Sequence, residues 1–401
     1  MKNDKWFIGT FIGIIVLIIL TYPITFILSR KGLVNIAFDN FKKPVYENGM
    51  FSSFTNLIEK IEVSIENRVN NYFPLYHSIN SFNSNVNNNL NKGLYKLFGI
   101  DYYPVGSDSQ NEMIFKTDKQ FNLLNISDKD ILNENMEKQI NFLNDVSKLD
   151  VNTYIYFVNR AEFYDFYNIN HLNNMKEYYL KFKSKLSKNI KTDELKVNNK
   201  EEYLKYFFKT DHHWNMYGAY QGYKDIMKLM NKESVDGEIF KVDGIKYIGS
   251  MGKSSYDSSL YDDLYDIKVN LKNHAVYVND SEDIQNYKEH KIKDTNNIYY
   301  DHYVAYFNGM YGKVEYDFNQ EDKANLLIIG DSFTWQIDNL IASSYNKTYI
   351  INLRYDEYEN GKLDLKKFIK DNNISDVLFL YETNALMFDQ YNYDFINKIE
   401  R

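Results

Sequence analysis

Between residues 326 and 399, short apolar runs alternate with stretches of helical pattern, and this alternation constrains the fold of the 401-residue chain more than any other feature. Continuous apolar runs this short are typical of buried strands in a parallel sheet. An earlier apolar run, at residues 151–158, predicts one more strand of the same kind. Strands separated by helices predict an α/β fold, a parallel sheet with helices on both faces and hence three layers. The expected strands are 151–158, 326–329, 348–353 and 377–381, and the expected helices are 172–186, 216–230, 335–344, 363–370 and 386–399.

We expect this α/β domain to occupy residues 101–401. Within it, residues 238–320 alternate Tyr, Val and Ile with polar residues and contain many Gly, Asn and Asp, which predicts a β-rich insertion. Residues 31–100 are expected to form a helical or linker region. Its first part has apolar residues at helical spacing, and its Asn-rich tract at 78–93 fits either a solvated helix or a loop.

The N-terminal region carries a membrane-spanning signal. Residues 6–29 contain no charged side chain, and about 20 apolar residues are enough to cross a bilayer as a helix. No small-residue cleavage site of the Ala-x-Ala type follows, so residues 1–30 are predicted to form an uncleaved transmembrane anchor. Lys2 and Lys5 precede the segment, and four Lys and Arg residues between 30 and 43 follow it. The number of positive charges therefore does not predict that the N-terminus lies in the cytoplasm. A large domain after a single N-terminal span is usually translocated, and we therefore expect it outside the cytoplasm.

Composition removes several classes of function. There are no cysteines, which excludes disulfides, thiolate metal sites and a cysteine nucleophile. The net charge is −8, and no block of Lys and Arg is interleaved with aromatic residues, so no nucleic-acid partner is expected. The 37 Tyr and 27 Phe fit either a sugar-binding surface or a simple compositional bias.

Ser332 stands where an expected strand turns into an expected helix. Gly330 permits a tight turn there, and the serine hydroxyl would project from the carboxyl end of the sheet, where α/β proteins form their sites. The backbone N–H of Ser332 would be placed to stabilise an oxyanion. In the alternative interpretation, Asp331 or Ser332 merely caps the helix.

Asp211 and His213 supply a carboxylate and an imidazole on a short local spacing. His213 can act as general base toward Ser332, and Asp211 can hold its tautomer. Two residues apart on an extended turn, both side chains point the same way, whereas His212 points away. Asp211 could instead cap the helix that follows. The three residues could also bind a metal, but adjacent histidines seldom converge on one ion without further ligands, so we expect neither metal nor cofactor.

Two more residues are candidates for the same edge of the sheet. Asn384 lies just past the last expected strand, and its side-chain amide could complete an oxyanion hole or simply cap a turn. Arg160 lies just past the strand at 151–158 and could contact substrate. Both are predicted here as substrate or oxyanion residues.

The tract Asp211–Trp214, followed much later by Gly330–Phe333, resembles the motifs of DHHW proteins. These are similar to polysaccharide O-acetyltransferases of the AlgX/AlgJ type, which carry an SGNH-hydrolase-like domain in a permuted motif order. The resemblance covers about residues 50–401 and implies Asp211 as the acid, His213 as the base and Ser332 as the nucleophile. Further similarity lies at Asn67, Arg68, Phe73, Pro74, Asn215, Tyr217, Gly218 and Ala219.

The resemblance implies a membrane-anchored, extracytoplasmic O-acetyltransferase that acts on a cell-surface or secreted polysaccharide through an acyl-serine. It also implies a multipass membrane-bound O-acyltransferase as partner, which supplies the acetyl groups. Three alternatives stay open: a carbohydrate esterase with the same triad, a non-catalytic glycan-binding or assembly subunit, and, more distantly, a D-alanylation role resembling DltD.

Overall fold

The computed structural model describes residues 76–108, 112–167, 173–282, 297–359, 361–390 and 393–400. The chain divides into two compact units, Met1–Asn85 and Val86–Arg401. The expected anchor at 1–30 and the helical pattern before residue 76 lie outside the described residues. Within the described ranges, no helix has both the length and the apolar character needed to cross a membrane. The Asn-rich tract is helical, as part of α3 (Tyr76–Leu97).

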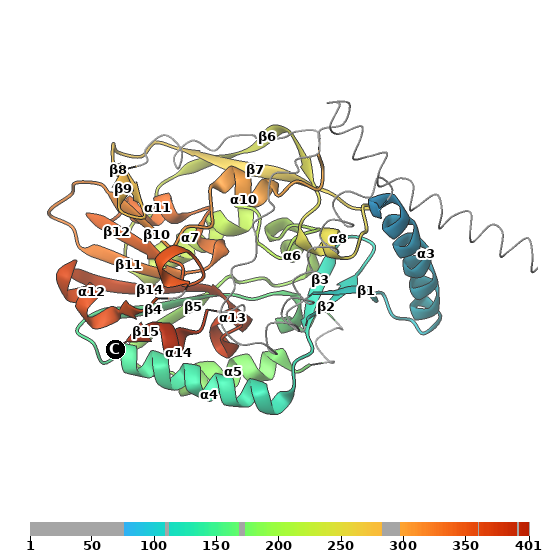
Figure 1. Ribbon diagram of the computed structural model, residues 1–401, viewed down its shortest axis with the longest axis horizontal. Coiled ribbons are helices and arrows are strands. Elements are labelled where there is room, and N and C mark those ends of the chain that lie inside the picture. The colour runs from blue at the N-terminus through green and yellow to red at the C-terminus, as the bar shows by residue number, and fades with distance from the viewer. Residues whose placement is uncertain are drawn as a thin grey trace, which may run out of the picture. The chain divides into compact units, whose positions relative to one another are not determined.

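The second unit is built on an eight-stranded sheet with the order β5-β4-β14-β11-β12-β10-β8-β9 (Figure 1). The first five strands pair in parallel; four of them are predicted from the sequence, whereas the edge strand β5 is not. The last three pair antiparallel, so the sheet is mixed, whereas the sequence predicts a parallel sheet. The strands are β4 (Asn152–Val158), β5 (Ile190–Glu194), β8 (Ala275–Val278), β9 (Ser281–Glu282), β10 (Lys313–Asp317), β11 (Asn325–Gly330), β12 (Lys347–Ile351) and β14 (Ile374–Glu382).

Both faces of this sheet are buried. Along β11, Leu326 and Ile328 join one hydrophobic core, whereas Leu327 and Ile329 join a second core on the other face. This alternation explains why the strand is a continuous apolar run, because both sets of side chains leave water. The core that contains Leu326 and Ile328 is covered by three helices, α6 (Lys200–Tyr206), α7 (Met216–Leu229) and α11 (Asp338–Ala342). The core on the other face is covered by four helices, α4 (Lys129–Val146), α5 (Met175–Lys185), α13 (Thr383–Phe388) and α14 (Phe395–Lys398).

The expected β-rich insertion is only partly β-structure. It contains an antiparallel ribbon of β6 (Gly237–Tyr247) and β7 (Asp262–Val269). It also contains two helices, α8 (Ser250–Ser254) and α10 (His302–Phe307), and its remaining strands extend the main sheet. The insertion is therefore not separate from the α/β domain, because β10 pairs directly with β12.

Two of the expected helices are broken. Instead of one helix at 335–344, a 3₁₀ turn η3 (Ser332–Thr334) precedes α11, with Ile337 outside helical geometry at φ −135° between them. The expected helix at 386–399 ends at Asp389, whose φ of 54° is left-handed, and α14 starts afresh. Both helices break because a single residue has a non-helical backbone conformation. The periodicity of apolar residues does not predict such a conformation.

The unit also contains a three-stranded antiparallel sheet that the sequence pattern does not predict. It consists of β1 (Tyr103–Asp108), β2 (Glu112–Lys116) and β3 (Phe121–Asn125). Two of its residues contact the segment that follows β4: Glu112 contacts Arg160, and the Asn125 N–H donates to Glu162. The remaining short elements are η1 (Ala161–Phe163), η4 (Asp356–Tyr358), β13 (Leu363–Asp364), α12 (Leu365–Asp371) and β15 (Ile399–Glu400).

Candidate active site

Ser332 lies at the carboxyl end of β11, on a turn that is held from several sides. A Cβ at Gly330 would meet Thr334 Cγ2 at 2.4 Å, so the tight turn requires glycine. Asp331 Oδ1 accepts a hydrogen bond from the Phe333 N–H at 2.9 Å, and Oδ2 accepts one from the Glu382 N–H at 2.9 Å. Asp331 therefore caps the turn and ties it to the end of β14, while the Ser332 hydroxyl is left for other contacts.

His213 lies on the loop between α6 and α7. Asn215 is the N-cap of α7, because its Oδ1 accepts from the Tyr217 and Gly218 N–H groups. The interpretation in which Asp211 caps this helix is therefore wrong. With Asn215 in that position, the preceding loop is free to turn Asp211 and His213 toward β11.

The loop and the β11 turn bring Asp211, His213 and Ser332 together. His213 Nε2 lies 2.6 Å from Ser332 Oγ, and His213 Nδ1 lies 2.6 Å from Asp211 Oδ1. With the proton on Nδ1, His213 donates to Asp211 and accepts from the serine hydroxyl, the arrangement of a Ser–His–Asp relay. The Tyr303 ring stacks on the His213 ring at 4.2 Å between centroids, and the Tyr303 hydroxyl donates to the Ser332 carbonyl oxygen at 2.9 Å.

Asp211 is buried and hydrogen-bonded on both oxygens. Oδ1 also accepts from the His213 N–H at 3.1 Å, and Oδ2 accepts from the Ser250 N–H at 2.8 Å. Burial by itself would raise the pKa of Asp211, but the neighbouring His213 and His212 and these hydrogen bonds lower it well below its ordinary value. The carboxylate therefore stays ionised beside His213.

His212 points to a different partner. Its Nδ1 lies 2.9 Å from Ser250 Oγ. Burial of the ring and the neighbouring His213 lower the pKa of His212. One ligand atom from each of Asp211, His212 and His213 lies within 4.8 Å of the others, close enough to share a metal ion. Both ring nitrogens of His213 already have partners in the relay, however, so an ion would have to replace those contacts.

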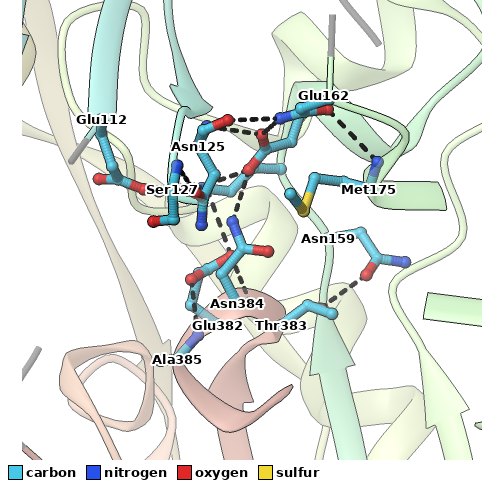
Figure 2. Close-up of polar contacts among 12 residues, drawn as sticks. Glu112, Asn125, Ser127, Asn159, Glu162, Met175, Glu382, Thr383, Asn384 and Ala385 are labelled. Carbon is cyan, nitrogen blue, oxygen red and sulfur yellow. Dashed lines mark hydrogen bonds and ion pairs between the residues drawn. The ribbon is translucent and has the colours of Figure 1, made fainter. Parts of the chain in front are cut away.

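Arg160 and Asn384 belong to a buried polar cluster, and Figure 2 labels Asn384 together with Glu112, Glu162 and Glu382 of this cluster. The Arg160 guanidinium contacts Glu112 Oε1 at 2.5 Å, Glu162 Oε1 at 2.7 Å and Glu382 Oε1 at 3.3 Å. Asn384 Nδ2 donates to Glu162 Oε1 at 2.5 Å. Neither side chain forms a hydrogen bond with Ser332 or His213 among the described residues.

A backbone hydrogen bond from Glu382 connects the cluster to the residue that precedes Ser332. Burial raises the pKa of Glu382 to about 8, with the Arg160 charge opposing it, and the Glu382 N–H donates to Asp331 next to Ser332. Burial likewise raises the pKa of Asp331 to about 6. The roles of Arg160 and Asn384 toward an oxyanion or substrate stay predictions.

Several supporting residues were not identified from the sequence. Ser250 contacts Asp211 from 39 residues away and Tyr303 contacts Ser332 from 29 residues away. Thr210 is held by Asp262 through both its N–H and its hydroxyl, and its Oγ1 accepts from the Gly249 N–H at 2.8 Å. No local motif marks these residues, because only the folding of the insertion against the loop brings them near.

The mixed α/β fold thus brings a serine, a histidine and an aspartate into contact at the carboxyl edge of its sheet, in the hydrogen-bonded order of a Ser–His–Asp triad. No protein-family model matches the chain, and no curated protein matches its sequence. Solved structures do match. PatB1 from Bacillus cereus, solved with a sulfonyl adduct, is 23% identical with a TM-score of 0.56, over 70% of this chain and 99% of that one.

A DHHW family protein from Eubacterium siraeum is 19% identical with a TM-score of 0.53, over 70% of this chain and 94% of that one. The predicted resemblance to DHHW proteins is thus confirmed as a shared fold. AlgX from Pseudomonas aeruginosa also matches, at 10% identity over 73% of this chain and 65% of that one, but its TM-score of 0.36 is too low to support an argument.

Proposed function

We propose that this chain is an O-acetyltransferase that acetylates a polysaccharide through Ser332. The observation that carries the proposal is the continuous hydrogen-bonded relay from Asp211 through His213 to Ser332, with 2.6 Å at each of its two links. An activated serine beside a correctly oriented imidazole is the arrangement that acyl transfer requires.

In the first half-reaction, Ser332 Oγ attacks the carbonyl carbon of an acetyl donor while His213 Nε2 takes the hydroxyl proton. The bond between the acetyl carbon and the donor's leaving oxygen breaks, and His213 returns the proton to that oxygen. In the second half-reaction, a sugar hydroxyl attacks the acetyl-serine. His213 takes its proton and passes it to Ser332 Oγ as the ester bond to serine breaks. Asp211 holds the imidazole in the productive tautomer in both halves.

The cellular setting is part of the proposal. We infer that residues 1–30 anchor the chain in the cell membrane and that the α/β domain lies on the extracytoplasmic side. A multipass membrane-bound O-acyltransferase would supply the acetyl groups. The uncharged segment 6–29 and the DHHW resemblance support this setting.

An esterase with the same relay is the second candidate, since water can replace the sugar hydroxyl in the second half-reaction. The outcome depends on whether the acceptor site excludes water from the acetyl-serine. A sugar acceptor in the assay therefore separates the two candidates.

The test uses the full-length protein in detergent, with p-nitrophenyl acetate as donor and phenylmethylsulfonyl fluoride as label. We expect p-nitrophenol release, sulfonylation of Ser332 found by peptide mass spectrometry, and acetylated product when an oligosaccharide is added. Ser332→Ala and His213→Ala should each lower turnover by at least ~10⁴-fold. The matched control is His274→Ala, whose histidine precedes β8 at the opposite edge of the sheet.

Each alternative has its own outcome. Turnover with no acetylated sugar would favour the esterase. A well-folded wild type with neither turnover nor Ser332 labelling would refute the serine mechanism and leave a glycan-binding subunit.

A further inference from the structure

The two histidines of the loop between α6 and α7 place the same ring nitrogen near one carboxylate. His213 Nδ1 lies 2.6 Å from Asp211 Oδ1, and His212 Nδ1 lies 3.6 Å from the same oxygen. The sequence predicts that His212 points away, and its ring does turn to Ser250, but Nδ1 stays close to the carboxylate. Two imidazole nitrogens and one carboxylate oxygen thus meet at one point of the loop.

The loop that carries these three residues is closed at its base. Phe207 and Trp214 form an antiparallel bridge, and the Phe208 N–H donates to the His213 carbonyl oxygen at 3.2 Å. From the other side, a backbone N–H at the start of α8 donates to Asp211 Oδ2 at 2.8 Å. The ligand atoms are therefore held near one another before an ion binds, which lowers the ordering entropy that binding costs.

The distances are close to those of a tetrahedral zinc site. Two histidines and one carboxylate form the ligand set of zinc sites that keep a fourth position for water. Zinc–ligand bonds of about 2.0–2.2 Å place the ligand atoms roughly 3.4 Å apart. The separation of 3.6 Å between His212 Nδ1 and Asp211 Oδ1 already fits. The separation of 2.6 Å between His213 Nδ1 and the same oxygen needs to open by roughly 0.8 Å.

The charges around the loop disfavour an ion that is held by charge alone. Burial and His213 lower the pKa of His212, and the charges of Arg160 and Arg354 add to this effect. Two nearby arginines repel any cation, and a hard ion such as Mg²⁺ prefers oxygen ligands, so its bonds to imidazole would not offset the repulsion. Zn²⁺ binds imidazole nitrogen strongly, and this ligand set therefore fits Zn²⁺.

An ion on His213 Nδ1 would disable the relay by changing the tautomer of the ring. In the active arrangement the ring proton lies on Nδ1, and Nε2 accepts from Ser332 Oγ at 2.6 Å. An ion that binds Nδ1 displaces this proton, and the neutral ring then carries its single proton on Nε2. That N–H can only donate toward Ser332, so the imidazole can no longer take the hydroxyl proton.

We propose that Asp211, His212 and His213 bind Zn²⁺ and that the bound ion reversibly inhibits the relay. This inference rests on the proposed acetyl transfer by Ser332 and names a regulation of that site, whereas the binding of the ion does not depend on that chemistry. His212 separates the two roles, because it is a ligand in the zinc site but takes no part in the proton transfers of the relay. Removal of the ion by a stronger chelator returns the proton to Nδ1 and restores the relay.

The first test measures binding without chemistry, using full-length Ser332→Ala protein in detergent after treatment with EDTA and dialysis. Isothermal titration calorimetry compares ZnCl₂ with MgCl₂. We expect one tightly bound Zn²⁺ per chain and no detectable binding of Mg²⁺. Adding His212→Asn should weaken Zn²⁺ binding at least ~10-fold, because removing a ligand costs no less than the ~10–100-fold that losing a hydrogen bond behind a ligand costs.

The second test measures p-nitrophenyl acetate turnover by the wild-type protein. We expect Zn²⁺ to inhibit turnover, EDTA to restore it and Mg²⁺ to have no effect. The Zn²⁺ concentration for half-inhibition should rise at least ~10-fold in His212→Asn, with each variant compared with its own turnover in metal-free buffer. His274→Asn is the matched control, because it removes a histidine that precedes β8 near the opposite edge of the sheet. It should leave the half-inhibition concentration unchanged.

Equal half-inhibition of wild type and His212→Asn would overturn the inference, as would equal effects of the two ions or turnover that rises with Zn²⁺. His212→Gln serves as the test if His212→Asn unfolds. If Ser332→Ala binds Zn²⁺ through His212 but the metal-free wild type shows neither turnover nor Ser332 labelling, the acetyl-transfer proposal fails and the three residues remain a zinc site.

Discussion

Asp211 accepts three hydrogen bonds, and together they define what this carboxylate can do. Two come from His213 and one from the Ser250 N–H. Because both oxygens are occupied, the carboxylate cannot turn away from the imidazole without losing bonds. At the residue scale, the site is therefore a pre-oriented relay whose geometry depends on one buried anion.

Asp211→Asn should lower p-nitrophenyl acetate turnover by about 10⁴-fold, the size seen when the orienting carboxylate of a serine triad is replaced by an amide. The amide can present an N–H to Nδ1 and so favour the wrong tautomer. Steady-state kinetics checks this, with a circular dichroism spectrum to confirm folding. A loss of less than tenfold in a folded variant would mean that Asp211 does not orient His213.

Glu382 should make stability depend on pH. Its pKa is raised by burial from 4.5 to about 8, so the folded state favours the protonated form. The stabilisation is full below about pH 4.5 and is lost as pH rises toward 8, at on the order of 1 kcal/mol per pH unit. Urea unfolding between pH 5 and 8 should therefore show a steeper fall in the free energy of unfolding for wild type than for Glu382→Gln. Parallel curves would contradict the prediction.

At the element scale, the short helix α8 supports the relay. Its N-cap Gly249 packs so closely on Asp211 that an added Cβ would lie 2.3 Å from Asp211 Cβ. The next residue, Ser250, supplies the N–H that binds Asp211 and the hydroxyl that contacts His212. The insertion thus contributes to the site through one close backbone approach.

Gly249→Ala should lower ester turnover at least ~10-fold, because the backbone must move away from Asp211 and carry the Ser250 N–H with it. Gly93→Ala is the matched control, since a Cβ there would have nothing within 4 Å, and alanine inside helix α3 should stabilise it by about 0.5–1 kcal/mol. Turnover and thermal unfolding midpoints of both variants provide the measurement. Full activity of Gly249→Ala would show that α8 does not set the position of Asp211.

At the scale of the whole α/β unit, the Arg160 cluster joins two sheets. Glu112 comes from β2 of the small sheet, Glu382 from the end of β14 and Glu162 from the turn after β4. Glu162 also accepts from the Asn125 N–H at the end of β3 at 2.9 Å. One buried cation thus contacts acidic side chains that converge from both sheets, which indicates a structural contribution by Arg160.

Arg160→Met should lower the free energy of unfolding by about 3–5 kcal/mol, the cost of leaving buried carboxylates without their cation. Lys185→Met, which breaks an exposed pair with Glu137, should cost less than about 1 kcal/mol. Urea unfolding at neutral pH compares the two. Weaker acceptor binding by a fully stable Arg160→Met variant would instead support the substrate role predicted from the sequence.

The sequence by itself determined four of the five parallel strands and the residues of the relay. Buried strands leave an unbroken apolar run, and Ser332 directly follows such a run, so its place at the carboxyl edge can be inferred locally. The spacing of Asp211 and His213 is likewise a local property, because two residues on an extended turn face the same way. Their catalytic roles remain predictions.

Only the tertiary structure decided the antiparallel edge of the sheet, the small sheet of β1 to β3 and the surroundings of the relay. Ser250 and Tyr303 carry no local signal, because each is defined by a partner on a different element. Arg160 shows the same limit, since its position past a strand indicates a site, whereas the three glutamates around it come from β2, η1 and β14. Long-range pairing is a property of the assembled chain, and apolar periodicity records only whether a side chain is buried, not which groups it meets.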